Sequence, residues 1–188
     1  MSDIIILKEM LQESLIASLN PHPYDINKKQ VILSEPDANY SVTIDSVPNE
    51  SEVIVIKTDA FIAPTTTFKS SKHECKRADF VIIINSDKHQ KIIFIELKAK
   101  STTSKESDII LQFKGARCFI TYCQEIGKLF WNEPNFLENY AYRYVSIRNI
   151  GLPKKPTRNK IHPTHDLPEK MLKIGAPNRL ILNQLIGN

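Results

Sequence analysis

The chain has 188 residues, of which 41% are hydrophobic and 24% are charged, with a formal net charge of +4. This length favours one domain, residues 1–188, that can bury a core. Apolar runs such as Phe80 to Ile84 are too short to cross a bilayer, and the chain starts without the basic leader of a signal peptide. We therefore expect a cytoplasmic protein that does not associate with membranes. The three cysteines include no Cys-x-x-Cys pair, which argues against a disulfide framework or structural zinc.

The charge is unevenly distributed along the chain. Residues 1–142 contain 16 Lys and Arg against 19 Asp and Glu, whereas residues 143–188 contain 9 against 2. From about residue 151 the sequence is also rich in proline, which predicts a basic C-terminal extension. A basic end on a nearly neutral body suits contact with nucleic acid, although a solubilising surface would explain it equally well.

The first half of the chain predicts one helix and several short strands. Residues 4–19 carry an apolar stripe that is typical of a helix. Three β-prone segments follow, at residues 31–33, 40–44 and 52–57. A long polar connection over residues 63–76 comes next, and loops of this length in compact domains often have a function.

Two strongly apolar strands, residues 79–85 and 91–98, flank a polar turn, which predicts an antiparallel hairpin. Both strands are apolar on both faces, so we expect layers on both sides of their sheet. A second helix over residues 108–126 and a strand over 142–147 follow. A short terminal helix is expected to bury a last apolar group: Met171, Leu172, Leu180, Ile181 and Leu185. This order predicts an α/β sandwich around a mixed sheet flanked by helices.

Three ionisable residues interrupt the hairpin at one end. If the turn centres between Asp87 and Lys88, Asp79 falls opposite Glu96, with Cβ atoms roughly 5 Å apart. Lys98 lies on the same face as Glu96 because side chains alternate along a strand. Two buried carboxylates this close repel each other, and a divalent cation between them would remove the repulsion.

The pattern of Asp79 followed by Glu96-Leu97-Lys98 resembles the signature of the PD-(D/E)XK, or restriction-endonuclease-like, nuclease superfamily. That superfamily shares a core of helix, three strands, helix and strand, which is the order predicted for residues 4–147. Ala78 stands where the signature has proline. The resemblance implies phosphodiester hydrolysis with Mg²⁺ or Mn²⁺, bound by Asp79, Glu96 and the backbone carbonyl of Leu97. It also implies that Lys98 assists the attacking water or stabilises the phosphate. The alternative is a pair of solvated strand ends with a Glu–Lys contact.

Two further residues fit this resemblance less specifically. Gln112 lies on the apolar side of the second helix, and many members carry a glutamine there near the metal. It could equally bind water at the helix edge. Glu13 could supply another acidic ligand from the first helix, as in some members, but a solvated face also explains it.

The remaining basic residues are candidates for contacts with nucleic acid: Lys76, Arg77, Lys100, Lys154, Lys155, Arg158 and Lys160. Together these features predict a metal-dependent endonuclease that acts on nucleic acid, on double-stranded DNA in preference to RNA. We expect a homodimer, to cut both strands, and a setting in restriction or phage defence. The alternative is a catalytically inactive nuclease-like domain that binds nucleic acid or a partner protein.

Overall fold

The described residues form two β-sheets, and the larger one is built around the predicted hairpin. A computed structural model describes residues 2–35, 40–61, 64–98, 105–148, 164–175 and 178–187. The helices are α1 (Asp3–Met10), α2 (Glu106–Phe130) and α3 (Asn183–Ile186), with 3₁₀ turns η1 (Glu13–Leu15) and η3 (Pro168–Lys170). The strands are β1 (Asn20–Pro21), β2 (Lys29–Glu35), β3 (Tyr40–Val47), β4 (Val53–Lys57), β5 (Phe80–Asn85), β6 (Gln90–Lys98), β7 (Ala141–Arg148), β8 (Leu172–Gly175) and β9 (Arg179–Ile181).

The larger sheet has five strands in the order β4-β5-β6-β7-β8. Strands β4, β5 and β6 are antiparallel neighbours, whereas β6, β7 and β8 run parallel to one another. This is the mixed sheet that the sequence predicts. Because the last three strands are parallel, their carboxyl ends lie along one edge of the sheet, next to the start of β5.

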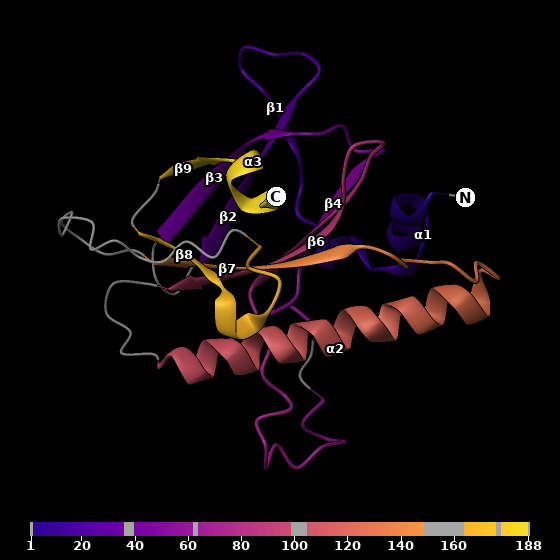
Figure 1. Ribbon diagram of the computed structural model, residues 1–188. Coiled ribbons are helices and arrows are strands. Elements are labelled where there is room, and N and C mark those ends of the chain that lie inside the picture. The colour runs from indigo at the N-terminus through magenta and orange to yellow at the C-terminus, as the bar shows by residue number, and fades with distance from the viewer. Residues whose placement is uncertain are drawn as a thin grey trace.

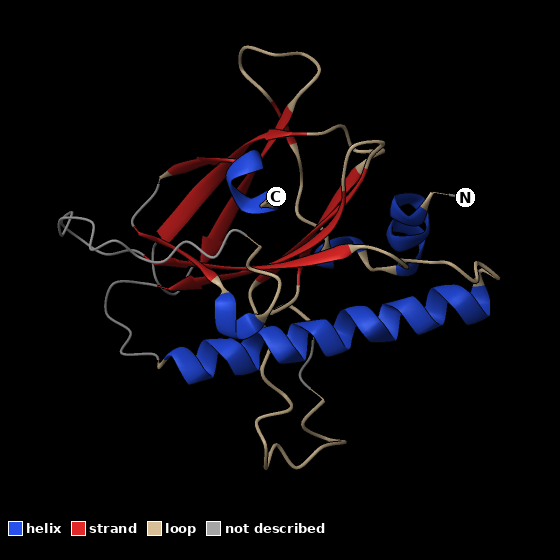
Figure 2. Cartoon of the chain, viewed as in Figure 1, coloured by secondary structure: helices blue, strands red, loops and turns tan. Residues whose placement is uncertain are grey.

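The two faces of this sheet are covered by different layers (Figures 1 and 2). Helices α1 and α2 pack on one face, where Val81, Phe94 and Tyr144 are buried. The second sheet, in the order β1-β2-β3-β9, and helix α3 cover the other face, where Ile82 and Ile95 are buried. The expectation of a layer on each side is confirmed. Helices α1 and α2 lie on the same face, however, and a second sheet with only the short helix α3 covers the opposite one.

Two predicted helices are shorter than expected. The first ends at Met10, because the chain then becomes extended and Ala17 donates a backbone hydrogen bond to Val55 at 2.8 Å. The terminal helix is replaced by β8, β9 and only one short helical turn, α3. These segments pair with β7 and β3 at open sheet edges, so tertiary pairing determines their structure. Ile181, expected to be buried, is 49% exposed.

Within the described parts of the chain, no helix is long and apolar enough to cross a membrane. Cys75, Cys118 and Cys123 are all free thiols.

Helix α2 approaches the segment that leads into β5 very closely at Gly115. A Cβ atom at this position would lie 1.6 Å from the carbonyl oxygen of Lys76. Only glycine therefore allows the helix to lie against residues 76–77 without moving the backbone that precedes Asp79.

Replacing Gly115 with alanine should therefore destabilise the protein. Alanine favours a helix by about 1 kcal/mol over glycine, but overpacking typically costs about 1–3 kcal/mol, and the contact here is with backbone that cannot rotate away. We expect a net loss of about 1–2 kcal/mol in the free energy of unfolding, measured in urea. Cys118→Ala, at an exposed position of the same helix, is the control and should change it by less than about 0.5 kcal/mol. An unchanged or raised stability for Gly115→Ala would contradict the close packing.

Candidate active site

The register of the β5–β6 hairpin brings Asp79 next to Glu96. The ladder pairs Asn85 with Gln90 and, at its other end, Phe80 with Ile95. The next pair outward is therefore Asp79 and Glu96, as the position of the turn predicts. One oxygen of Asp79, Oδ2, accepts a hydrogen bond from the amide of Leu97 at 2.6 Å, which fixes the carboxylate against β6.

Glu96 is the most buried charged residue of this group, with no exposed surface. Its Oε1 atom contacts the ammonium of Lys98, whose side chain is 15% exposed. Its Oε2 atom has no hydrogen-bond partner among the described residues. A buried carboxylate oxygen without a partner is costly, so this atom is available to a ligand.

Burial controls the ionisation of both carboxyl groups. It raises the pKa of Glu96 well above its ordinary range, and nearby Asp79 raises that pKa further while Lys98 opposes the shift. Burial also raises the pKa of Asp79 to about 7, against the lowering effects of the Leu97 amide and of Lys98. The single positive charge of Lys98 does not compensate two buried carboxylates, so this end of the hairpin favours an additional cation.

Lys98 itself is held in its charged form. Burial acts to lower its pKa, but the contact with Glu96, together with Asp79 and Glu35, outweighs burial and raises the pKa. The ammonium therefore remains protonated at neutral pH.

Two acidic residues that the sequence did not indicate also act on this group. Glu35, at the end of β2 in the second sheet, raises the pKa of Asp79 and of Glu96. Asp59, just after β4, raises the pKa of Asp79. No local pattern could have identified Glu35, because its proximity depends on how the two sheets pack.

Strand β7 adds two residues beside the hairpin. Ser146 is the register partner of Glu96, and Arg148 is the register partner of Lys98. Neighbours in register on parallel strands project from the same face. The hydroxyl of Ser146 is buried and has no hydrogen-bond partner among the described residues. The sequence predicted a strand over residues 142–147, which contains Ser146. Only the pairing of this strand with β6 shows that Ser146 lies beside Glu96.

The start of β5 is held by a small network around Thr58. Its hydroxyl donates to the carbonyl of Ala78 at 2.5 Å, and its amide donates to the carbonyl of Asp79 at 2.9 Å. The guanidinium of Arg77 donates to the carbonyls of Thr58 at 3.1 Å and Asp59 at 3.2 Å, and lies over the ring of Phe61. Arg77 was predicted to contact nucleic acid, but its donors are used by the protein backbone, which gives it a structural role.

Two other residues that the sequence predicted for the site are Lys76 and Gln112. Lys76 forms an ion pair with Asp108 at 2.6 Å. Gln112 is half-buried in α2, one turn beyond Asp108 and on the stripe that Gly115 presents to residues 76–77. None of the hydrogen bonds between described residues joins Gln112 to Asp79, Glu96 or Lys98.

Glu13 is exposed in η1 rather than in a helix, and it does not contribute to the pKa shifts of the three central residues. The structure therefore does not bring Glu13 into the group. Five predicted basic residues lie outside the described residues: Lys100, Lys154, Lys155, Arg158 and Lys160.

The donors that the structure does bring together fit a hard divalent cation. No group of three or more His, Cys, Asp or Glu side chains is arranged to hold a metal ion in the described parts of the chain. Two carboxylates, one with an unpartnered oxygen, are nevertheless the protein ligands that Mg²⁺ commonly takes, with water and phosphate completing its shell. Comparison with family models, with curated proteins and with solved structures finds no match for this chain.

The raised pKa of Asp79 predicts how stability depends on pH in the absence of metal. Between about pH 4 and pH 7 the unfolded carboxyl group loses its proton while the folded one keeps it, so the folded state becomes less favoured as the pH rises. Asp79→Asn removes this penalty and retains an oxygen for the Leu97 amide. Relative to the unmodified protein, we expect its stability to be about 2–4 kcal/mol more favourable at pH 8 than at pH 4.

Urea unfolding at both pH values, with EDTA present, measures this difference. Asp87→Asn, in the exposed turn at the far end of the hairpin, is the control and should show no such dependence. The same effect of Asp79→Asn at both pH values would show that burial does not perturb this carboxyl group.

Proposed function

We propose that this chain is a metal-dependent endonuclease with a restriction-endonuclease-like fold, which hydrolyses phosphodiester bonds in double-stranded DNA. The observation that carries the proposal is half-buried Asp79 next to fully buried Glu96, with Lys98 in direct contact with Glu96. A protein gains no stability from two adjacent buried carboxylates, so a pair retained in this arrangement is best explained by a ligand that needs it.

The order of the elements supports the proposal. Helix α1, the antiparallel strands β4, β5 and β6, helix α2 and strand β7 occur in this order, as helix, three strands, helix and strand, with η1 and strands β1, β2 and β3 between α1 and β4. Asp79 directly precedes the second of these strands, and Glu96 and Lys98 lie at the end of the third, which agrees with the resemblance to the PD-(D/E)XK pattern.

Each residue of the group has a defined part in the proposed reaction. Asp79, Glu96 and the carbonyl of Leu97 would hold Mg²⁺ or Mn²⁺. Such an ion polarises phosphoryl oxygens and lowers the pKa of water. Lys98, which keeps its proton on Nζ beside Glu96, stabilises negative charge that develops on the phosphate, as preorganised cations do in phosphoryl transfer. A charged ammonium suits this stabilising role better than it suits the role of a general base.

A homodimer would place one such site at each strand of a duplex, and we propose restriction or phage defence in the cytoplasm as the setting. The homodimer and this setting are both inferred from the proposed activity.

Cleavage assays with double-stranded DNA, single-stranded DNA and RNA test the activity. With Mg²⁺ or Mn²⁺ present, we expect cleavage of double-stranded DNA, and a loss of about 10²–10³-fold in rate for Lys98→Ala and Glu96→Gln. Lys88→Ala, in the exposed turn distant from the pair, should cleave at the unmodified rate. No cleavage of any substrate by the unmodified protein would overturn the proposal, as would equal rates for all variants.

Metal binding can be measured without activity. At pH 8 and at about 10–100 times the dissociation constant, Mn²⁺ should raise the free energy of unfolding by about 1–3 kcal/mol through its preference for the folded state. Asp79→Asn and Glu96→Gln should lose this increase, whereas Asp87→Asn should keep it. Thermal unfolding with and without Mn²⁺ provides the measurement, and an equal gain in all proteins would place the ion elsewhere.

A further inference from the structure

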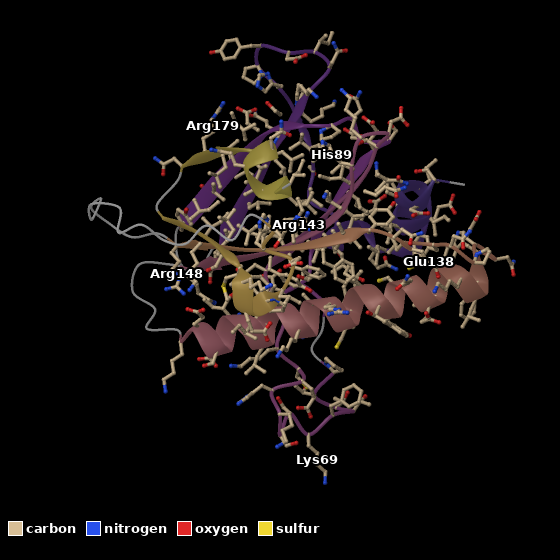
Figure 3. The ribbon with its side chains drawn as sticks, in the orientation of Figure 1. Lys69, His89, Glu138, Arg143, Arg148 and Arg179 are labelled. Atoms are coloured by element: carbon tan, nitrogen blue, oxygen red, sulfur yellow. The ribbon has the colours of Figure 1, made fainter. Side chains whose placement is uncertain are left out.

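Arg148 lies beside the candidate site although it is distant from the hairpin in sequence. It is the last residue of β7 and pairs in register with Lys98 on one side and Gly175 on the other. In Figure 3 it lies at the end of the sheet where α2 begins. Because β6 and β7 are parallel, Arg148 projects from the same face as Glu96 and Lys98.

The guanidinium of Arg148 differs from the other described arginines because it has no partner among the residues that the structure describes. Its Nε atom is buried and has no hydrogen-bond partner among the described residues, and no described carboxylate forms an ion pair with it. Every other arginine that the structure describes has a contact: Arg77 and Arg143 with backbone carbonyls, Arg117 with the ring of Tyr142, and Arg179 with Asp45.

This arrangement is unfavourable unless an anion joins it. A buried guanidinium donor without an acceptor costs free energy, and a second cation, Lys98, lies on the neighbouring strand. The planar donors of an arginine match the oxygens of a phosphate, which they bind through two parallel hydrogen bonds. Ser146, two residues before Arg148 on β7, has a hydroxyl without a hydrogen-bond partner among the described residues and is the register partner of Glu96.

We propose that Arg148 binds a phosphodiester group of the nucleic acid next to the Asp79–Glu96 pair. The assignment rests on the proposed function and adds a binding residue to it. The carboxylates on β5 and β6 form the negative part of the site, and Lys98 with Arg148 forms the positive part.

The test measures binding separately from cleavage. The probe is a fluorescein-labelled DNA duplex of about 20 base pairs, followed by fluorescence anisotropy, with Ca²⁺ in place of Mg²⁺ and over a series of salt concentrations. Arg148→Gln should weaken binding roughly 10- to 100-fold and reduce the slope of log K against log salt by about one, because one phosphate contact is lost. Arg148→Lys keeps the charge and should restore the slope and part of the affinity.

Arg117→Gln, which removes the same charge from the exposed side of α2, is the matched control and should leave the salt slope unchanged. If Arg148→Gln does not fold, as judged by its thermal transition, Arg148→Met replaces it, since methionine preserves the apolar stem.

The outcomes separate this assignment from the proposed function. Weaker binding and a smaller slope without cleavage by the unmodified protein would support Arg148 and overturn the nuclease. Cleavage with unchanged binding and slope in Arg148→Gln would overturn the assignment alone. If the unmodified protein neither binds nor cleaves the duplex, both are wrong.

Discussion

The arrangement of this protein depends on two carboxylates buried at the open end of a hairpin. Glu96 has no exposed surface and Asp79 beside it is only partly exposed, so water screens their repulsion weakly. Lys98 supplies one positive charge for two negative ones, and Glu35 from the second sheet adds to the excess. Apolar residues at these two positions would make the sheet more stable. The two carboxylates therefore lower the free energy of unfolding, and they do so at the candidate site.

The position of Asp79 is maintained by hydrogen bonds to the backbone carbonyls of the segments around it. Thr58 binds the carbonyls on both sides of the Ala78–Asp79 bond, and Arg77 fixes the end of β4 to the same segment. Helix α2 presses on this segment through Gly115. The long connection before β5 therefore ends in a rigid frame, and the helix that follows the hairpin contributes to the geometry of the residue that precedes it.

The sequence predicted the hairpin and its register because both depend on local features: a polar turn and two strands apolar on each face. It overextended the first helix because Ile16 and Ala17 pair with β4, a contact that no helical periodicity reveals. It missed β8 and β9 because short strands at sheet edges owe their structure to their neighbours. Arg77, in the candidate site, could not be interpreted from the sequence for the same reason. A basic residue near the proposed motif suggests a phosphate ligand, and only the structure shows that its guanidinium donates to a backbone carbonyl.

The mixed topology of the larger sheet separates charge in a way that suits a phosphodiester substrate. Its antiparallel half ends in the two carboxylates, and its parallel half adds Arg148 beside Lys98 at the same edge. A nuclease needs both parts, because a cation must be held by oxygen ligands while an anion is held within reach of it. A hairpin alone supplies only the first part. The parallel strand β7, which follows α2, supplies the second, and this gives the strand a role in the proposed chemistry as well as in the fold.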